Sequence, residues 1–137
     1  MIITIETTVS APIERVWNAW ISPSAIEQWN FASDDWQCPT ATVDLRVGKR
    51  FSSRMEAKDG SMEFDFEGTF TAIDPQKNIE YSLDDDRKVT VRFEDSAEGV
   101  RVIETFEAED ELTGEQQRQG WQAILNNFKH YVESKND

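Results

Sequence analysis

The sequence predicts an α+β fold, in which a curved antiparallel sheet of seven strands surrounds one long C-terminal helix. The helix is indicated by apolar residues on one face, at positions i, i+3, i+4, i+7 and i+11: Trp121, Ile124, Leu125, Phe128 and Val132. The strands are indicated by apolar and polar residues that alternate through most of residues 40–106. Because a single helix with one apolar face needs a sheet against which to bury it, we expect the sheet to curl around the helix.

The N-terminal part of the chain predicts one strand and two short helices. Residues 2–9 alternate apolar and polar side chains, as a half-buried strand does. Residues 12–20 and 22–29 carry apolar side chains at helical spacing, and a proline near the start of each suits a first helical turn. Residues 30–39 show neither period, so we expect a loop there.

Six further strands and the final helix complete the order. The strands are expected over residues 40–47, 51–55, 62–72, 79–83, 89–93 and 100–106. Turn residues separate them: Gly48, Asp59–Gly60, Asp74–Pro75, Asp84–Asp86 and Glu98–Gly99. Thr113 and Gln116 have the spacing of a capping box, which predicts where the final helix begins.

Length and charge predict one soluble domain over residues 1–137. The 27 acidic residues outnumber the 14 basic ones, and the net charge of −13 argues against nucleic acid or an anionic membrane as a partner. The single cysteine, Cys38, cannot form an internal disulfide. No stretch has the character of a signal peptide or a membrane span, so we expect a cytoplasmic protein.

Aromatic residues are concentrated on the predicted inner face of the sheet: Phe51, Phe64, Phe66, Phe70, Tyr81, Phe93 and Phe106. Packing alone could explain these rings, since burying each one stabilises a core by about 1.5–3 kcal/mol. A strongly bent sheet around one helix is nevertheless hard to fill, and the two short helices would close one end. Gly68 is interpreted as a bend that lets the sheet curl. Gly120 marks either a close contact with a strand or the true start of the helix.

We therefore predict a ligand cavity between the sheet and the C-terminal helix. Its predicted lining is Trp29, Trp36, Phe51, Met55, Phe64, Phe66, Tyr81, Val91, Glu104, Trp121, Leu125 and Phe128. Trp29, Trp36 and Tyr81 would frame the opening, because each ring combines an apolar face with a polar tip. The alternative is that these rings form a lid over a solid core.

Glu104 is the most informative polar residue. By alternation it shares the inner face with Val102 and Phe106, where a carboxylate must be paired, hydrogen-bonded, protonated or in contact with a wet cavity. One interpretation is a ligand anchor or a general acid or base with a raised pKa. The alternatives are a glutamate that reaches solvent at the strand end or one that bonds to a tryptophan indole.

The remaining polar candidates favour structural roles. Arg46 and Arg54 are expected to pair with acids on the outer face of the sheet, the alternative being a place at the cavity mouth. His130 lies off the apolar face of its helix, and Cys38 has no adjacent base, so neither predicts catalysis. The sequence contains no zinc-ligand spacing, phosphate-binding glycine loop, nucleophile elbow or dinucleotide fingerprint, so we predict no catalytic residue, metal or cofactor.

A set of short motifs resembles those of a known family. The motifs are Ala11–Trp17, Trp20–Pro23, Gln28–Trp29, Asp44–Gly48, Glu67–Gly68, Asp74–Pro75, Glu104–Phe106 and Gly120–Phe128. Together they resemble the activator-of-heat-shock-protein-90-ATPase-like family of the START-like, or SRPBCC, superfamily, over nearly the whole chain. The resemblance implies a helix-grip fold, shared with the birch-pollen allergen, and a deep internal cavity. Lys49 departs from the pattern, because a second glycine often follows Gly48 in the family.

Three hypotheses for function follow. The leading one is a non-catalytic module that holds a small hydrophobic or amphipathic molecule in the cavity, because the inner face is rich in rings and catalytic machinery is not recognisable. The family's name adds a second, a protein-interaction module that modulates a chaperone ATPase. The third is a cyclase- or hydrolase-type enzyme that uses Glu104 with a cavity tyrosine or tryptophan. Relatives bind lipids, hormones or polyketides, so the fold alone does not select among the three.

Overall fold

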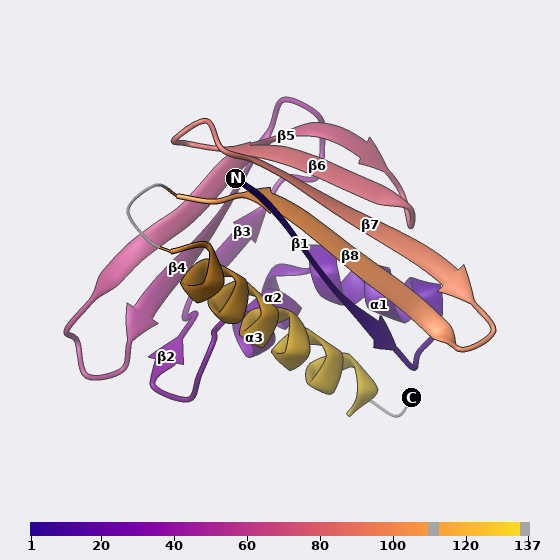
Figure 1. Cartoon of the computed structure of the whole chain (residues 1–137), viewed down its shortest axis with the longest axis horizontal. Helices are drawn as coiled ribbons and strands as arrows, with labels where there is room; N and C mark the ends of the chain where they lie inside the picture. The colour runs from indigo at the N-terminus through magenta and orange to yellow at the C-terminus, as the bar shows by residue number, and fades with distance from the viewer. Residues whose placement is uncertain (110–112, 135–137) are drawn as a thin grey trace.

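A computed structural model describes residues 1–109 and 113–134. One curled antiparallel sheet carries three helices on its concave side (Figure 1). The elements are β1 (Ile2–Val9), α1 (Ile13–Ile21), α2 (Pro23–Trp29), β2 (Trp36–Gln37), β3 (Ala41–Val43), β4 (Arg50–Ala57), β5 (Glu63–Asp74), β6 (Asn78–Leu83), β7 (Lys88–Ser96), β8 (Gly99–Glu107) and α3 (Gly114–Glu133). The predicted α+β fold is therefore confirmed.

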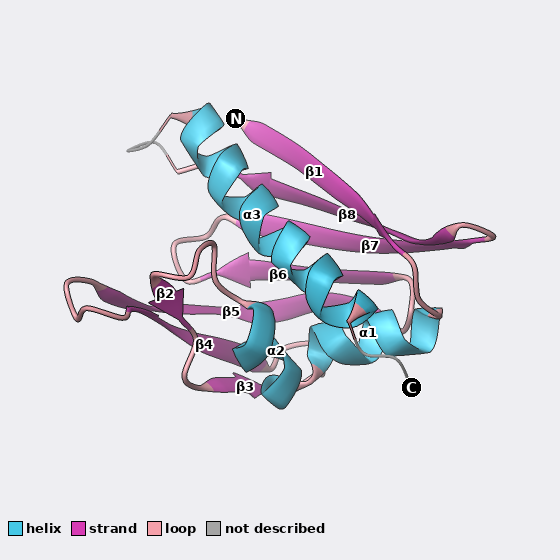
Figure 2. Ribbon diagram, turned by 90° about the horizontal axis from the view of Figure 1, so that it is seen from below, coloured by secondary structure: helices cyan, strands magenta, loops and turns pink. Residues whose placement is uncertain are grey.

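The sheet follows the order β1-β8-β7-β6-β5-β4-β2, and β3 pairs with β4 beside this path. In Figure 2, α3 runs obliquely across the sheet, while α1 and α2 lie near the C-terminal end of α3. Two local differences from the sequence prediction occur near the β4 edge. The strand predicted over residues 40–47 stops at Val43, because the chain turns before Gly48, whose φ is +86°. The segment predicted as a loop contains the two-residue strand β2, which pairs with the end of β4.

Helix α3 is attached to the edge of the sheet at β1. Three of its polar side chains donate hydrogen bonds to backbone carbonyls on alternate residues of that strand. The bonds are Arg118 Nη1 to Thr4 O (2.9 Å), Gln122 Nε2 to Glu6 O (3.3 Å) and Lys129 Nζ to Thr8 O (2.5 Å). These contacts satisfy acceptors that an edge strand would otherwise leave open, and they hold the helix close to one side of the sheet.

The predicted helix starts are confirmed within one residue. Thr113 Oγ1 accepts from the Gln116 backbone at 3.1 Å, and the Gln116 side chain accepts from the Thr113 backbone, so the capping box forms. Pro23 is the first residue of α2, as expected. Pro12 caps α1 rather than beginning it.

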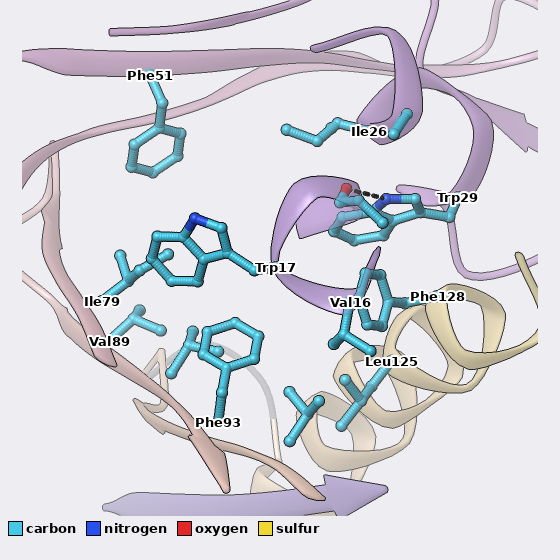
Figure 3. Packing of buried hydrophobic residues seen from close by; sticks show 14 of the residues in the cluster. Val16, Trp17, Ile26, Trp29, Phe51, Ile79, Val89, Phe93, Leu125 and Phe128 are labelled. Atoms are coloured by element: carbon cyan, nitrogen blue, oxygen red, sulfur yellow. Dashed lines mark hydrogen bonds between the residues drawn. The ribbon is translucent and has the colours of Figure 1, made fainter. Parts of the chain in front are cut away.

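Figure 3 shows part of the apolar core, where side chains of the helices meet side chains of β4, β6 and β7. Trp17 points toward Ile79, Val89 and Phe93 in that view. The ring of Phe128 contacts Trp20 and Trp29, both edge-on with centroids 4.9 Å apart. The dashed line in Figure 3 is the hydrogen bond that the Trp29 indole donates to Ala19 O, at 3.0 Å.

The structure requires a glycine at position 68 but not at position 120. A Cβ on Gly68 would overlap the carbonyl oxygen of Ser82 and approach the Phe51 ring, so the tight pairing of β5 and β6 requires a glycine there. A register shift at Phe70 and Ala72 adds to the bending of the same strand. Both expectations for Gly120 are wrong, since a Cβ there would meet nothing within 4 Å and α3 begins at Gly114. Nothing in the described residues explains that glycine.

Within the described residues, the helices lack the length and apolar character that a membrane crossing requires.

Candidate ligand-binding cavity

A cavity of about 750 Å³ lies between the concave face of the sheet and α3. Strands β4, β5 and β6 form most of its wall, the two short helices close one side, and α3 contributes Trp121 and Ile124. Among the described residues, none of the lining comes from β1 or β7. The hollow therefore occupies one half of the concave face, on the side away from the edge to which α3 is attached.

Eight of the predicted cavity residues line this space. They are Trp29, Phe51, Met55, Phe64, Phe66, Tyr81, Glu104 and Trp121. They come from α2, β4, β5, β6, β8 and α3, so the fold brings together side chains that are far apart in the sequence. The rings contact one another around the wall, with Phe51 and Tyr81 at 4.7 Å and Phe66 and Trp121 at 5.9 Å between centroids.

Four of the predicted residues lie outside the cavity. Trp36 is half-buried beside β4 and packs against the ring of Phe64 at 6.0 Å. Val91, Leu125 and Phe128 are fully buried, with exposures of at most 1%. They lie in the part of the interior that α1 and α3 cover, and they are not among the lining residues of the cavity. Alternation identifies which residues point inward, but it does not distinguish the filled half from the hollow half.

Several lining residues were missed by the sequence analysis. Trp20, Ile21, Ile26, Val43, Leu45, Ser53, Leu83 and Ile124 also contact the cavity. Ser53 had a usable signal, because it alternates with Phe51 and Met55 on the inner face of β4. The rim residues Asp84, Asp85 and Arg87 had none, since they lie in a turn whose place depends on the whole fold.

Glu104 lies inside the cavity wall, on β8 between the register partners Ile5 and Val91. Its side chain is 6% exposed, which excludes the alternative of a strand end in bulk solvent. Among the described residues, no ion pair or hydrogen bond reaches its carboxyl group, and the Trp29 indole bonds to Ala19 instead. Among the described residues, every side-chain N or O atom that is completely enclosed has a hydrogen-bond partner. Because the Glu104 oxygens have no partner, they are not completely enclosed, and they face the open space of the cavity.

Burial determines the protonation of the two acidic groups in the wall. Desolvation raises the pKa of Glu104 to about 8. Burial also raises the pKa of Tyr81 well above its usual value, and the nearby charge of Glu104 adds to that shift. Both side chains are therefore largely protonated at neutral pH, and the cavity wall carries two O–H groups among apolar neighbours.

The mouth of the cavity lies between the first half of β5, the β6–β7 turn and Glu109, which follows β8. Lining residues there are exposed, including Phe64 at 47%. Arg87 is the one basic side chain among the described lining residues, and it is held by Asp85 at 2.8 Å and Glu109 at 3.5 Å. The rim is consequently acidic overall, and its single cation is already paired.

Other polar candidates lie away from the cavity. Arg54 pairs with Glu56, Glu63 and Asp65 on the outer face, as expected. Arg46 pairs with Asp44 in an exposed turn. His130 is exposed, and Cys38 is buried. Burial is the main cause that raises the pKa of the Cys38 thiol.

The part of the chain that the structure describes holds no group of three or more His, Cys, Asp or Glu residues placed to bind a metal ion.

The family model described as Activator of Hsp90 ATPase homolog 1-like protein matches residues 10–133. The chain belongs to this family. No curated protein matches it. Since the match covers the elements that build the cavity, from α1 to α3, the hollow half of the sheet lies within the family's domain.

Solved structures with similar folds agree with this assignment. The solution structure of the AHSA1-like protein from Aeromonas hydrophila is 48% identical, with a TM-score of 0.92, and the match covers 98% of this chain and 93% of that one. A solution structure from Cytophaga hutchinsonii is 44% identical, with a TM-score of 0.84, covering 96% and 92%. A crystal structure from Chromobacterium violaceum is 26% identical, with a TM-score of 0.87, covering 97% and 98%.

Proposed function

We propose that this protein binds a small hydrophobic or amphipathic molecule in the cavity between the sheet and α3. The observation that carries the proposal is the cavity itself, a hollow of about 750 Å³ with an aromatic and aliphatic wall. Pockets that bind small molecules typically measure about 300–1,000 Å³ and combine apolar walls with a few polar groups. Glu104, Tyr81 and Ser53 supply such groups here.

The side chains of the cavity wall are preorganised for an apolar ligand. Its rings hold one another by edge contacts, such as that of Phe51 with Tyr81, and the large residue Trp121 stacks on Phe106 at 3.9 Å. A ligand would gain free energy by covering apolar surface, at about 25 cal/mol for each Å² removed from water, with little rearrangement of the wall.

A dye titration with a cavity-filling variant tests the proposal. The neutral dye Nile red should bind the wild type and brighten, because its emission increases in an apolar site. Ile124→Trp adds bulk to the lining residue of α3 and should weaken dye binding at least tenfold. Gln119→Trp adds the same side chain on the exposed face of α3 and should leave binding unchanged. Equal binding by both variants, or no dye binding by the wild type, would contradict the proposal.

Native mass spectrometry of protein purified without detergent provides an independent test. A retained molecule should appear as a mass shift that denaturation removes, and Ile124→Trp should reduce its occupancy. The same shift in Ile124→Trp would place the molecule outside the cavity.

The other two hypotheses have narrower support. Modulation of a chaperone ATPase is supported by the family's name, and a stimulation assay with the host chaperone is its test. A catalytic role is supported by Glu104, whose raised pKa suits a general acid, and by Tyr81 in the same wall. Hydrolysis of p-nitrophenyl esters that Glu104→Gln abolishes would favour the enzyme over the binding protein.

A further inference from the structure

We infer that the ligand is an amphipathic amine, whose apolar body fills the cavity and whose ammonium group pairs with the Glu104 carboxylate. The inference rests on the proposed binding function and specifies its ligand class. It follows from three features of the wall: the absence of a counter-ion for Glu104 among the described residues, the aromatic rings around it, and the sign of the charge at the mouth.

The first feature is the missing positive charge. No described basic side chain contacts Glu104, and Arg87 at the rim is already bound by Asp85 and Glu109. A buried carboxylate without a cation is strongly disfavoured, so a ligand that supplies one gains a desolvated ion pair. A ligand that carries a carboxylate would instead add a second negative charge beside the first.

The second feature is the ring wall. Phe51, Tyr81, Trp29 and Trp121 line the same space as Glu104. An ammonium group near the face of such a ring is attracted by the negative charge of the ring face, and the effect is largest where water is excluded. Aromatic rings together with one carboxylate form the kind of site that recognises an alkylammonium group rather than a neutral polar group.

The third feature is the electrostatic field at the mouth. Asp84, Asp85 and Glu109 are exposed there and exceed their ion-pair partners Arg50 and Arg87 by one charge, and the whole chain carries a net charge of −13. Such a field raises the local concentration of cations and repels anions. Cationic ligands are therefore favoured at the mouth of the cavity as well as beside Glu104.

Binding would be coupled to release of a proton. At neutral pH Glu104 is mostly protonated, so its carboxylic acid loses H⁺ to solvent when the protonated amine takes its place beside the carboxylate. The affinity for the amine should rise with pH up to about 8, where Glu104 ionises without help. The other titratable groups of the wall and rim are Asp65, Glu67, Tyr81, Asp84, Asp85, Arg87 and Glu109.

The test uses three probes with one carbon skeleton: 4-phenylbutylamine, 4-phenylbutanol and 4-phenylbutyrate. Isothermal titration calorimetry at pH 6, 7 and 8, in buffers of different ionisation heat, measures both affinity and proton release. The amine should bind at least tenfold more tightly than the alcohol at pH 8, and the carboxylate should bind most weakly. Glu104→Gln should weaken the amine at least tenfold and leave the alcohol within twofold. Glu109→Gln, at the rim, should weaken the amine less than threefold.

The outcomes separate this inference from the binding function. Equal affinities for amine and alcohol, unaffected by Glu104→Gln, would overturn the inference while Nile red binding still supported the cavity. Tighter binding of the alcohol, with an affinity that falls as the pH rises through 8, would show Glu104 acting as a neutral hydrogen-bond donor and would also overturn it. Proton release by the wild type is measured without any variant, so the test does not depend on the folding of Glu104→Gln.

Discussion

The two halves of the concave face differ in how completely they are filled. On one half, α1 and the C-terminal part of α3 cover β7, β8 and β1, and residues such as Val91, Val102 and Phe128 are 0% exposed. On the other half, β4, β5 and β6 face a cavity of about 750 Å³. Both halves carry alternating apolar side chains, so the difference does not come from the strand pattern.

The position of α3 accounts for the difference. Its polar side chains bond to the β1 carbonyls at Thr4, Glu6 and Thr8, and this attachment draws the helix toward one edge of the sheet. A helix has a diameter of about 10–12 Å, so it cannot also fill the far side of a wide curved sheet. The half left open carries the rings of Phe51 and Tyr81 and the acidic mouth, and Glu104 on β8 lies at its border and lines the cavity. A packed half that fixes the helix thus creates the space in which a ligand could be held.

The largest expected effect distinguishes a ring in the filled half from one in the hollow half. Phe128→Ala should destabilise the protein by about 3–5 kcal/mol, because this ring is 0% exposed and its removal loses the packing against Trp20 and Trp29. Phe66→Ala should cost only about 1–2 kcal/mol, because the ring is half-buried and borders space that is already open. Urea denaturation of both variants measures the free energies, and similar losses would show that the two halves are equally packed.

The next prediction concerns Glu104, the buried carboxyl group that lines the cavity. The pKa of Glu104 rises from the ordinary 4.5 to about 8 in the folded protein, so between these values the folded chain holds a proton that the unfolded chain has lost. The stability that this proton gives is complete below pH 4.5 and is lost as the pH rises through 8. Between pH 6 and 8 the free energy of unfolding should fall by about 2.3 kcal/mol from this group alone, at up to about 1.4 kcal/mol for each pH unit below 7 and at about half that slope at pH 8.

Glu104→Gln removes that dependence and keeps the shape of the side chain. The stability of the variant relative to the wild type should therefore increase from pH 6 to pH 8 and level off above it. Subtracting the two proteins cancels the repulsion that the high net charge contributes to both. A constant difference across this range would show that Glu104 is ionised in the folded state, which would place it in contact with bulk water.

The sequence predicted the sheet and helix much better than it predicted the border between the two halves. Alternation placed Phe51, Tyr81 and Glu104 on the inner face, and helical spacing placed Trp121 opposite them, because both signals are local. Leu125 and Phe128 carry the same helical signal but lie in the filled half. What separates them from Trp121 is the oblique course of α3, set by contacts with β1 more than 100 residues away in the chain. The rim residues Arg87 and Glu109 depend on the same long-range arrangement.

A smaller effect is expected at Gly68, in the wall of the hollow half. An alanine there would place its Cβ against the carbonyl oxygen of Ser82 and close to the Phe51 ring. Because backbone has to move, Gly68→Ala should destabilise the fold by about 1–3 kcal/mol and widen the β5–β6 pairing. Denaturation gives the free energy, and amide chemical shifts of β5 and β6 report the pairing. Unchanged shifts with unchanged stability would contradict the role of this glycine in the curvature of the sheet.

The smallest expected effect has the opposite sign and comes from the helix that faces both halves. Gly120 lies within α3, where a Cβ would meet nothing within 4 Å. Alanine is favoured over glycine in a helix interior by up to about 1 kcal/mol, so Gly120→Ala should stabilise the protein by about 0.5–1 kcal/mol. Because the neighbouring Trp121 lines the cavity, the same variant also tests whether stiffening α3 alters the hollow half: Nile red affinity should stay within twofold of the wild type. A loss of stability would reveal a contact that this glycine makes possible. Weaker dye binding together with higher stability would show that the cavity needs a mobile helix to admit its ligand.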